Sequence, residues 1–399
     1  MSVSRRGFLQ VFGAGRAESV SGALLAARGL EAHFAEAAQN GRPARPLVPP
    51  GVTEVRINSN ENPLGPGRAA LDAILGKFPE AGRYPFNATP LDSDLVAHIA
   101  SKYGTKPEFV VLGAGSQELL KSAVRAFTSP TRALVTASPS FENCPQVAKQ
   151  LGHPVKDVLV DAAFKLDIEK MTAAASGAGL VFFNNPNNPT ATVHGLKTVT
   201  DFVERVRRAS PDTVILIDEA YHDYVTDPSY QTAIPLALAT PNVFVTRTLS
   251  KAYGMAGMRI GYAIGQAETM KPLATLKMPY NVSTLGVAAA MVALDDASHI
   301  DAERARNTQA RAFTVKALET LGCKPTDSQT NFVFVDVHRT AEAFRDACAK
   351  SGVMVGRDFP PFEKTHARIS IGTMEEMQKA TEVFRSVLRP ATPTAGRQQ

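Results

Sequence analysis

Lys251 lies in a stretch, residues 246–262, whose side chains could bind an aldehyde that carries a phosphate group. Thr248 and Ser250 come just before the lysine, Arg259 follows eight residues later, and glycines would let a flat ligand approach closely. A lysine amine forms a Schiff base with an aldehyde, while hydroxyl groups and a guanidinium bind phosphate. A phosphorylated aldehyde cofactor needs these groups. A surface lysine in a glycine-rich loop would show the same residues, so the other motifs have to decide.

A second glycine-containing turn, residues 113–118, follows an apolar run and opens a helical pattern. Backbone amides at the start of a helix bind anions, so Gly115, Ser116 and Gln117 are candidates for a phosphate site. The turn could also begin a dinucleotide-binding fold. However, Glu118 stands where the third glycine of that fingerprint belongs, and residues 136–138 include no acid to bind a ribose. We therefore interpret the turn as a phosphate site for a different ligand.

Asp218 directly follows the apolar run 214–217, where an acid is costly to bury unless a cation pairs with it. A protonated pyridine nitrogen is such a cation, and Tyr221 on the same loop could reach a phenolic oxygen of the same ring. The alternative role for Asp218 is a helix N-cap. Asn188 lies in a loop with two Asn-Pro steps and could donate to that oxygen, although a plain turn would also explain it.

Two further residues could contact a planar, charged ligand. Phe141 comes shortly after the apolar run 133–136 and could stack on a ring, or it could be an ordinary core residue. Arg368 opens the apolar run 368–371 and could bind a carboxylate. It could equally keep its guanidinium at the surface with only its stem buried.

Short apolar runs alternate with helical patterns along most of the chain and would position these residues. Strands are predicted at 109–112, 133–136, 180–183, 213–217 and 243–245. This alternation is typical of an α/β fold whose mainly parallel sheet is covered by helices on both faces. After about residue 290, helices alternate with two more predicted strands, which indicates a smaller α+β domain.

The N-terminus carries the pattern of an export signal. Arg5 and Arg6 are followed by Phe8 and Leu9, as in a twin-arginine signal, although an ordinary basic terminus would fit as well. We expect the protein to be periplasmic or secreted if the signal is used, and cytoplasmic otherwise. The chain then divides into a signal at 1–40, a linker at 41–51, an N-terminal segment with part of the small domain at 52–80, a large domain at 81–290, a small domain at 291–388 and a disordered tail at 389–399.

Composition excludes several classes of protein. The net charge of +5 comes from the two ends: residues 1–50 hold six arginines and three glutamates, and residues 389–399 add two arginines, so 51–388 is neutral. Nucleic-acid binding is therefore not expected. The three cysteines are far apart without a CxxC pair, which predicts no metal site. No apolar run approaches the length of a membrane-spanning helix, so we expect no integral membrane association.

Taken in order, these motifs resemble a known family. The motifs at 60–63, 83–85, 113–118, 185–190, 218–221, 248–259 and 368–376 occur in the order and spacing of the fold-type I pyridoxal-phosphate aminotransferases of classes I and II. Within that family the chain is most similar to the histidinol-phosphate aminotransferases. The resemblance covers roughly residues 52–388. It implies an aspartate-aminotransferase-like fold with a seven-stranded type of sheet, and pyridoxal 5'-phosphate as cofactor.

The resemblance also implies roles for individual residues. Lys251 would bond to the cofactor and later move the proton, Asp218 would pair with the pyridine nitrogen, and Tyr221 would bond to the phenolic oxygen. The implied cofactor-binding set is completed by Gly115, Ser116, Gln117, Phe141, Asn188, Thr248, Ser250, Arg259 and Tyr84. Because Tyr84 would reach the cofactor of a neighbouring subunit, the resemblance implies a homodimer. A lysine among apolar and cationic groups is expected to have a lowered pKa.

For the substrate, the resemblance implies that Arg368, Arg357 and Asn60 face an amino donor and a 2-oxo acid. Three positions depart from the histidinol-phosphate enzymes. Residues 46–53 contain no tyrosine, Phe141 stands where tyrosine is frequent, and an extra residue precedes the usual arginine position at Arg357. We predict a transaminase whose donor is histidinol phosphate or an aromatic amino acid. The alternatives are a decarboxylase of the threonine-phosphate type, a nicotinamide-dependent oxidoreductase and a non-catalytic exported binding protein.

Overall fold

The computed structural model describes residues 54–84 and 91–388 of the chain. The chain divides into two units, Met1–Leu47 and Val48–Gln399, and all described residues belong to the second. The export signal predicted at 1–40, the linker at 41–51, the tyrosine-free segment 46–53 and the tail at 389–399 lie outside the described residues. The export signal and the localisation that depends on it therefore stay predictions.

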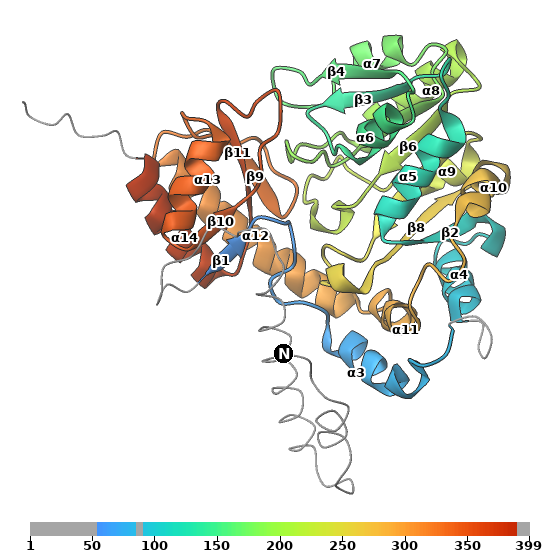
Figure 1. Cartoon of the computed structure of the whole chain (residues 1–399), viewed down its shortest axis with the longest axis horizontal. Helices are drawn as coiled ribbons and strands as arrows, with labels where there is room; N and C mark the ends of the chain where they lie inside the picture. Colours follow the sequence, from blue (N-terminus) through green and yellow to red (C-terminus); the bar gives the residue numbers. More distant parts are fainter. Residues whose placement is uncertain (1–53, 85–90, 389–399) are drawn as a thin grey trace, which may run out of the picture. The chain divides into compact units, whose positions relative to one another are not determined.

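A seven-stranded sheet forms the larger part of this unit (Figure 1). Its strands are β2 (Val110–Ala114), β3 (Leu134–Ser138), β4 (Val155–Leu159), β5 (Leu180–Asn184), β6 (Val214–Asp218), β7 (Val243–Thr248) and β8 (Ile260–Gly265). In space they lie in the order β2-β8-β7-β6-β5-β3-β4. Only β8 runs against its neighbours, pairing antiparallel with β2 and with β7. The mainly parallel sheet predicted from the alternating pattern is confirmed.

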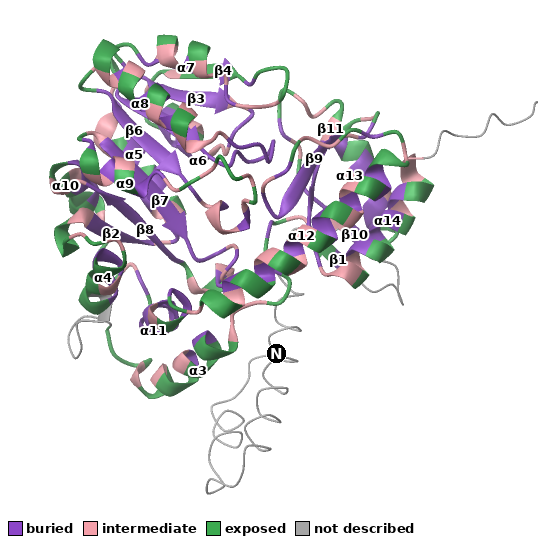
Figure 2. Cartoon of the chain, turned by 180° about the vertical axis from the view of Figure 1, so that it is seen from behind, coloured by how far each residue is buried: buried purple, intermediate pink, exposed green. Residues whose placement is uncertain are grey.

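The central strands are apolar throughout because helices cover both faces of the sheet. Alternate side chains of β5 point to opposite faces: Leu180 and Phe182 pack in one core cluster, Val181 and Phe183 in another. The first cluster includes side chains of α5 (Ser116–Phe127), α6 (Asn143–Gln150) and α10 (Ala267–Leu276). The second includes side chains of α4 (Leu91–Lys102), α7 (Ile168–Ala174), α8 (Leu196–Ala209), α9 (Ile234–Ala239) and α11 (Thr284–Ala293). Figure 2 shows the buried strands between these helices.

A second group of elements has its own apolar core. It contains β1 (Val55–Ile57), α12 (Ala297–Glu319), β9 (Phe332–Asp336), α13 (Ala341–Lys350), β10 (Val353–Val355), β11 (His366–Ser370) and α14 (Met374–Leu388). Strand β1 pairs parallel with β10, and β11 pairs antiparallel with β9. The first strand of the described chain thus lies with its last elements. The exact boundaries proposed for the two domains stay predictions.

Shorter elements connect these parts. They are α3 (Arg68–Lys77), which packs against α11, and the 3₁₀-helices η1 (Phe78–Glu80), η2 (Pro107–Phe109), η3 (His222–Tyr224) and η4 (Ala256–Met258). Within the described ranges, no helix combines the length and the apolar character that crossing a membrane requires.

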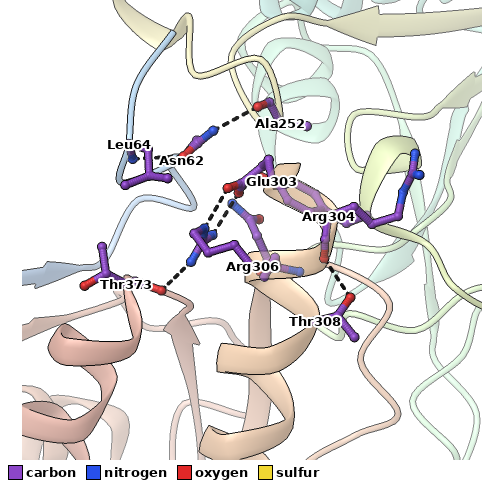
Figure 3. Close-up of polar contacts among 12 residues, drawn as sticks. Asn62, Leu64, Ala252, Glu303, Arg304, Arg306, Thr308 and Thr373 are labelled. Carbon is purple, nitrogen blue, oxygen red and sulfur yellow. Dashed lines mark hydrogen bonds and ion pairs between the residues drawn. The ribbon is translucent and has the colours of Figure 1, made fainter. Parts of the chain in front are cut away.

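A buried carboxylate on α12 ties the two groups of elements together (Figure 3). Glu303 accepts a hydrogen bond from the Tyr224 hydroxyl at 3.0 Å and from Arg306 Nε at 2.6 Å. Arg306 also donates to the Gly372 carbonyl at 2.5 Å, next to the end of β11. Nearby, Asn62 Nδ2 donates to the carbonyl of Ala252 at 2.9 Å. The Asn62 bond places the loop before α3 beside the residue that follows Lys251, and the Arg306 bond holds the end of β11 against α12.

Candidate active site

The segments that carry the predicted site residues meet at one edge of the sheet. Asn184, Asp218 and Thr246 are register partners on β5, β6 and β7. The chain leaves each of these parallel strands at the same edge, which is where α/β proteins bind ligands. The loops after β3, β5, β6 and β7 carry Phe141, Asn188, Tyr221 and Lys251, and they converge for this topological reason.

Asp218 is a buried acid at the end of β6, with 3% of its surface exposed. Thr246 on the neighbouring strand donates a hydrogen bond to its carboxylate at 2.8 Å. The pKa of Asp218 is raised to about 7, mainly by burial and also by the charge of Glu219, whereas Thr246 and Lys251 act in the opposite direction. A carboxyl group in this setting becomes fully ionised when a cation lies against it, which fits the predicted pyridinium partner.

Lys251 follows β7 and is partly buried, near one aromatic ring and two arginines. Its Nζ donates to the Ser59 carbonyl at 3.3 Å and lies 5.6 Å from the centre of the Tyr221 ring. Burial lowers the pKa of Lys251 to about 8, and the positive charges of Arg368 and Arg259 also lower it. The predicted direction of this pKa shift is confirmed. A larger fraction of the amine is therefore neutral near pH 7 than for an exposed lysine, as a nucleophile requires.

The start of α5 forms a cradle for an anion. Gly115 precedes the helix with a φ of 73° and supplies no side-chain cap to the first amides. A Cβ atom at Gly115 would lie 2.3 Å from Nη2 of Arg259, so another residue there would displace that guanidinium. Ser116 is half-buried and Gln117 is exposed on the first turn. Free helix-start amides next to an arginine suit a phosphate group.

Thr248 and Ser250 complete this cradle from the other side. Arg259 Nη1 donates to Ser250 Oγ at 3.2 Å, and its Nη2 donates to the Ala114 carbonyl at 3.2 Å. The Ser250 amide donates to Thr248 Oγ1 at 3.1 Å. Both hydroxyl residues are buried. The two glycine-containing motifs of the sequence therefore build a single site around Arg259.

Tyr221 is held by a polar chain that comes from the second group of elements. Asn60 Nδ2 donates to the Tyr221 hydroxyl oxygen at 3.0 Å, and Ser370 Oγ donates to Asn60 Oδ1 at 2.7 Å. Burial raises the pKa of Tyr221 to about 12, so its hydroxyl stays protonated. Because the oxygen accepts from Asn60, the proton can be donated to an acceptor on a ligand.

Arg368 lies on β11 with its guanidinium in the site. It donates to Asn188 Oδ1 and to the Asn58 carbonyl, each at 2.9 Å, while its buried Nε has no partner. Burial lowers the pKa of Arg368 to about 10. The bond to Asn188 occupies the oxygen of that amide, so its nitrogen faces away as a donor. A buried guanidinium with an unused N–H is suited to an anionic group of a ligand.

The other predicted residues lie at the margin of this group. Phe141 is partly buried and packs against the core cluster that includes α5 and α6. Arg357 is paired with Glu142. Tyr84 has 67% of its surface exposed, and its ring lies 4.8 Å from that of Tyr280. The described contacts do not link Tyr84 to Lys251 within the chain.

Sequence reasoning missed a buried ion pair behind Asp218. Arg247 Nε lies 2.8 Å from Glu219 Oε2, and the two side chains are only 8% and 1% exposed. Thr232 bonds to both partners. The available signal was a pair of opposite charges at the ends of the apolar strands β6 and β7. Their register places Asp218 beside Thr246, and hence Glu219 near Arg247.

We predict that Arg247→Met lowers the free energy of unfolding by about 3–5 kcal/mol, because it leaves Glu219 buried without a counter-charge. The measurement is chemical denaturation of the purified protein. The matched double variant, Glu219→Leu with Arg247→Met, also lacks the buried carboxylate charge. Much of the stability lost in the single variant should therefore return. A loss of under about 1 kcal/mol, typical of an exposed pair, would contradict the prediction.

Comparison with known proteins decides the family. Residues 53–384 match the family described as Aminotransferase class I and II. The chain belongs to this family. It is 34% identical over 336 residues to a histidinol-phosphate aminotransferase of Symbiobacterium thermophilum, covering 84% of this chain and 90% of the relative.

Solved structures agree with this family assignment. A histidinol-phosphate aminotransferase from Sinorhizobium meliloti, in complex with pyridoxal-5'-phosphate, is 28% identical with a TM-score of 0.77, and the match covers 84% of this chain and 92% of that one. An aspartate aminotransferase variant of Thermus thermophilus, at 20% identity, has the same fold with a TM-score of 0.74 over 87% of this chain and 99% of that one. The aspartate-aminotransferase-like fold is confirmed.

The chain is therefore a transaminase that uses pyridoxal 5'-phosphate. Its own residues fit the cofactor. Buried Asp218 suits a pyridinium, Lys251 has a lowered pKa that suits an aldehyde, and the glycine-lined cradle at Arg259 suits a phosphate. Family membership decides against the nicotinamide-dependent oxidoreductase and the non-catalytic binding protein considered from sequence.

Proposed function

We propose that this aminotransferase moves an amino group from a histidinol-phosphate-like or aromatic amino donor to a 2-oxo acid. The observation that carries the proposal is Arg368, a buried guanidinium whose Nε has no partner and whose charge lowers the pKa of Lys251. An anionic group of the substrate at Arg368 would place the substrate beside the reactive amine. The names of several relatives support the donor class.

The residues of the site have separate roles in the proposed reaction. Gly115, Ser116 and Gln117, with Thr248, Ser250 and Arg259, would hold the cofactor phosphate; Tyr221 and Asn188 would bond to its phenolic oxygen, and Phe141 would stack on its ring. When bound, the cofactor supplies an electron sink that makes the α-proton of the donor removable. Asp218 keeps the ring nitrogen protonated. Lys251 Nζ would take the α-proton from the donor as general base and, as general acid, would deliver a proton to the C4′ carbon of the cofactor.

A donor panel tests this proposal. Histidinol phosphate, histidinol, phenylalanine, tyrosine and threonine phosphate are each supplied with 2-oxoglutarate, and glutamate formation and carbon dioxide release are both measured. Glutamate formed with one of the proposed donors supports the proposal. Carbon dioxide without glutamate would instead identify a decarboxylase of the threonine-phosphate type and overturn it.

The same panel is repeated with Arg368→Lys. Lysine keeps the charge but loses the planar fork that binds an acid with two bonds. We expect kcat/KM to fall by about 10- to 200-fold, as for loss of a charge-assisted hydrogen bond worth about 1.5–3 kcal/mol. Arg345→Lys, on α13 and paired with Asp358, is the matched control and should stay near wild type.

We also propose that the protein is a homodimer. Three exposed apolar side chains support this: Tyr84, Met278 and Tyr280. Tyr84 and Tyr280 also border a cavity of about 530 Å³ with residues 282–285. A partner subunit would cover this surface and receive Tyr84 near its cofactor. The mass in solution, measured by light scattering, tests the proposal, and a monomeric mass in the active protein would overturn it.

A further inference from the structure

One of the two arginines predicted to face the substrate is paired with a carboxylate of the protein itself. Arg357, just after β10, forms a two-pronged ion pair with Glu142, and the Nη2–Oε2 distance is 2.5 Å. Glu142 is the residue before α6, in the large sheet's group of elements, and directly follows Phe141. The pair therefore bridges the two groups at the margin of the site.

An aromatic ring connects this ion pair to Arg368. The Phe359 ring lies 4.4 Å from the Arg357 guanidinium carbon and 4.8 Å from that of Arg368. The Phe359 side chain is buried, so its ring holds the two cations in a fixed relation. The charge of Arg357 lowers the pKa of Arg368, and that of Glu142 raises it. Glu142 thus offsets part of the repulsion between the two arginines.

A cavity beside the ion pair offers the Glu142 side chain a second position. This cavity has a volume of about 410 Å³ and is lined by Glu142, Gln146, Lys149 and Phe359. Positions 142, 146 and 149 follow helical spacing, so Glu142, which directly precedes α6, lies on the same side as Gln146 and Lys149 of that helix. Lys149 can provide a counter-charge for Glu142 there, since its contact with Asp157 is long, at 3.7 Å, and largely exposed.

We propose that Glu142 is a specificity-determining residue: it occupies Arg357 until an acidic group at the far end of the substrate takes its place. This inference rests on the proposed function, in which Arg357 and Arg368 face the substrate. The Arg357 and Glu142 side chains are 51% and 27% exposed, and ion pairs in such settings are weak. A second acidic group on a substrate can therefore replace Glu142 at small cost.

Displacement of Glu142 from Arg357 would distinguish substrates by the number of acidic groups that they carry. A substrate with a second acidic group has to displace Glu142 and then gains Arg357. A substrate with one acidic group uses Arg368 and leaves the ion pair in place. The protein thus distinguishes the two classes of substrate in two ways: Arg357 attracts the second acidic group, and Glu142 competes with that group for Arg357.

The test is Glu142→Gln, which keeps the shape of the side chain and removes its charge. We measure binding of glutarate and of pentanoate to the holoenzyme through the cofactor absorbance, because these unreactive acids have five carbons each and differ in the second carboxylate. Glutarate should bind about two- to fivefold more tightly to the variant, the range expected for release of an exposed ion pair. Pentanoate should bind as it does to wild type.

Two matched variants complete the design. Asp201→Asn removes a charge at the surface of α8, away from Arg357 and from the cavity, and it should leave glutarate binding unchanged. In an Arg357→Gln background, Glu142→Gln should no longer affect glutarate. Unchanged glutarate binding in Glu142→Gln, or an equal gain for pentanoate, would overturn the proposal. Since this measurement needs no turnover, failure of the donor panel would reject the proposed function separately.

Discussion

Lys251→Ala is expected to lower turnover by about 10⁴-fold or more, because it removes both the nucleophile and the group that carries the proton. The Gly115–Arg259 cradle does not involve the lysine, so the variant should still bind the cofactor through its phosphate. The measurements are steady-state transamination and cofactor binding by equilibrium dialysis. Lys271→Ala, at an exposed position on α10, is the control and should retain full activity.

The pKa of Lys251 adds a pH dependence to this expectation. Only the neutral amine attacks an aldehyde, and burial lowers the pKa of Lys251 to about 8. The rate of covalent attachment of the cofactor to the apoprotein should therefore rise about tenfold per pH unit below pH 8 and level off above it. A rate that still rises steeply at pH 10 would show an unperturbed amine. Substantial transamination by Lys251→Ala would remove the lysine from its assigned role.

Asp218→Asn should have the second largest effect, with kcat lower by about 10²- to 10⁴-fold. The amide keeps the size of the side chain but cannot stabilise a proton on the ring nitrogen, so the donor α-proton becomes harder to remove. The hydrogen bond from Thr246 at 2.8 Å can be kept by the amide oxygen, so the fold should survive. Steady-state kinetics and a thermal melt distinguish the two effects.

The control for Asp218→Asn is the same change at an exposed acid. Asp201 on α8 pairs with Lys197 at the surface, and its side chain is 52% exposed. Asp201→Asn should leave kcat near wild type. If Asp218→Asn kept activity within about tenfold of wild type, well short of the 10²-fold lower limit, the aspartate would not support the ring nitrogen.

Much of the fold was predictable because its signals are local. The apolar runs that predicted strands at 180–183 and 213–217 correspond to β5 and β6, with ends differing by one residue. A strand buried on both faces has to be apolar throughout, and that requirement is visible in the sequence. The strand predicted at 109–112 begins one residue before the observed strand, because η2 extends to Phe109 and β2 begins at Val110. There a proline at position 107 favours a tight helical start.

The convergence of the candidate site residues was also predictable, for a different reason. Lys251, Asp218 and Arg259 each follow or begin a strand, and the topology of a parallel sheet brings strand ends together. Sequence position and residue type therefore indicated one site before any distance was known. The structure added how each group is tuned: Thr246 bonds to Asp218, and Asn60 bonds to Tyr221.

By itself, the sequence determined the class of chemistry, because that chemistry needs particular residue types at strand ends that local patterns reveal. Only the tertiary structure decided how the two arginines proposed to face the substrate are paired. Arg357 and Glu142 are 215 residues apart, and Arg368 and Asn188 are 180 apart. Charge pairing at such separations depends on how two groups of elements pack, and no local pattern encodes that distance. For this reason the partners of these arginines became visible only in the folded chain.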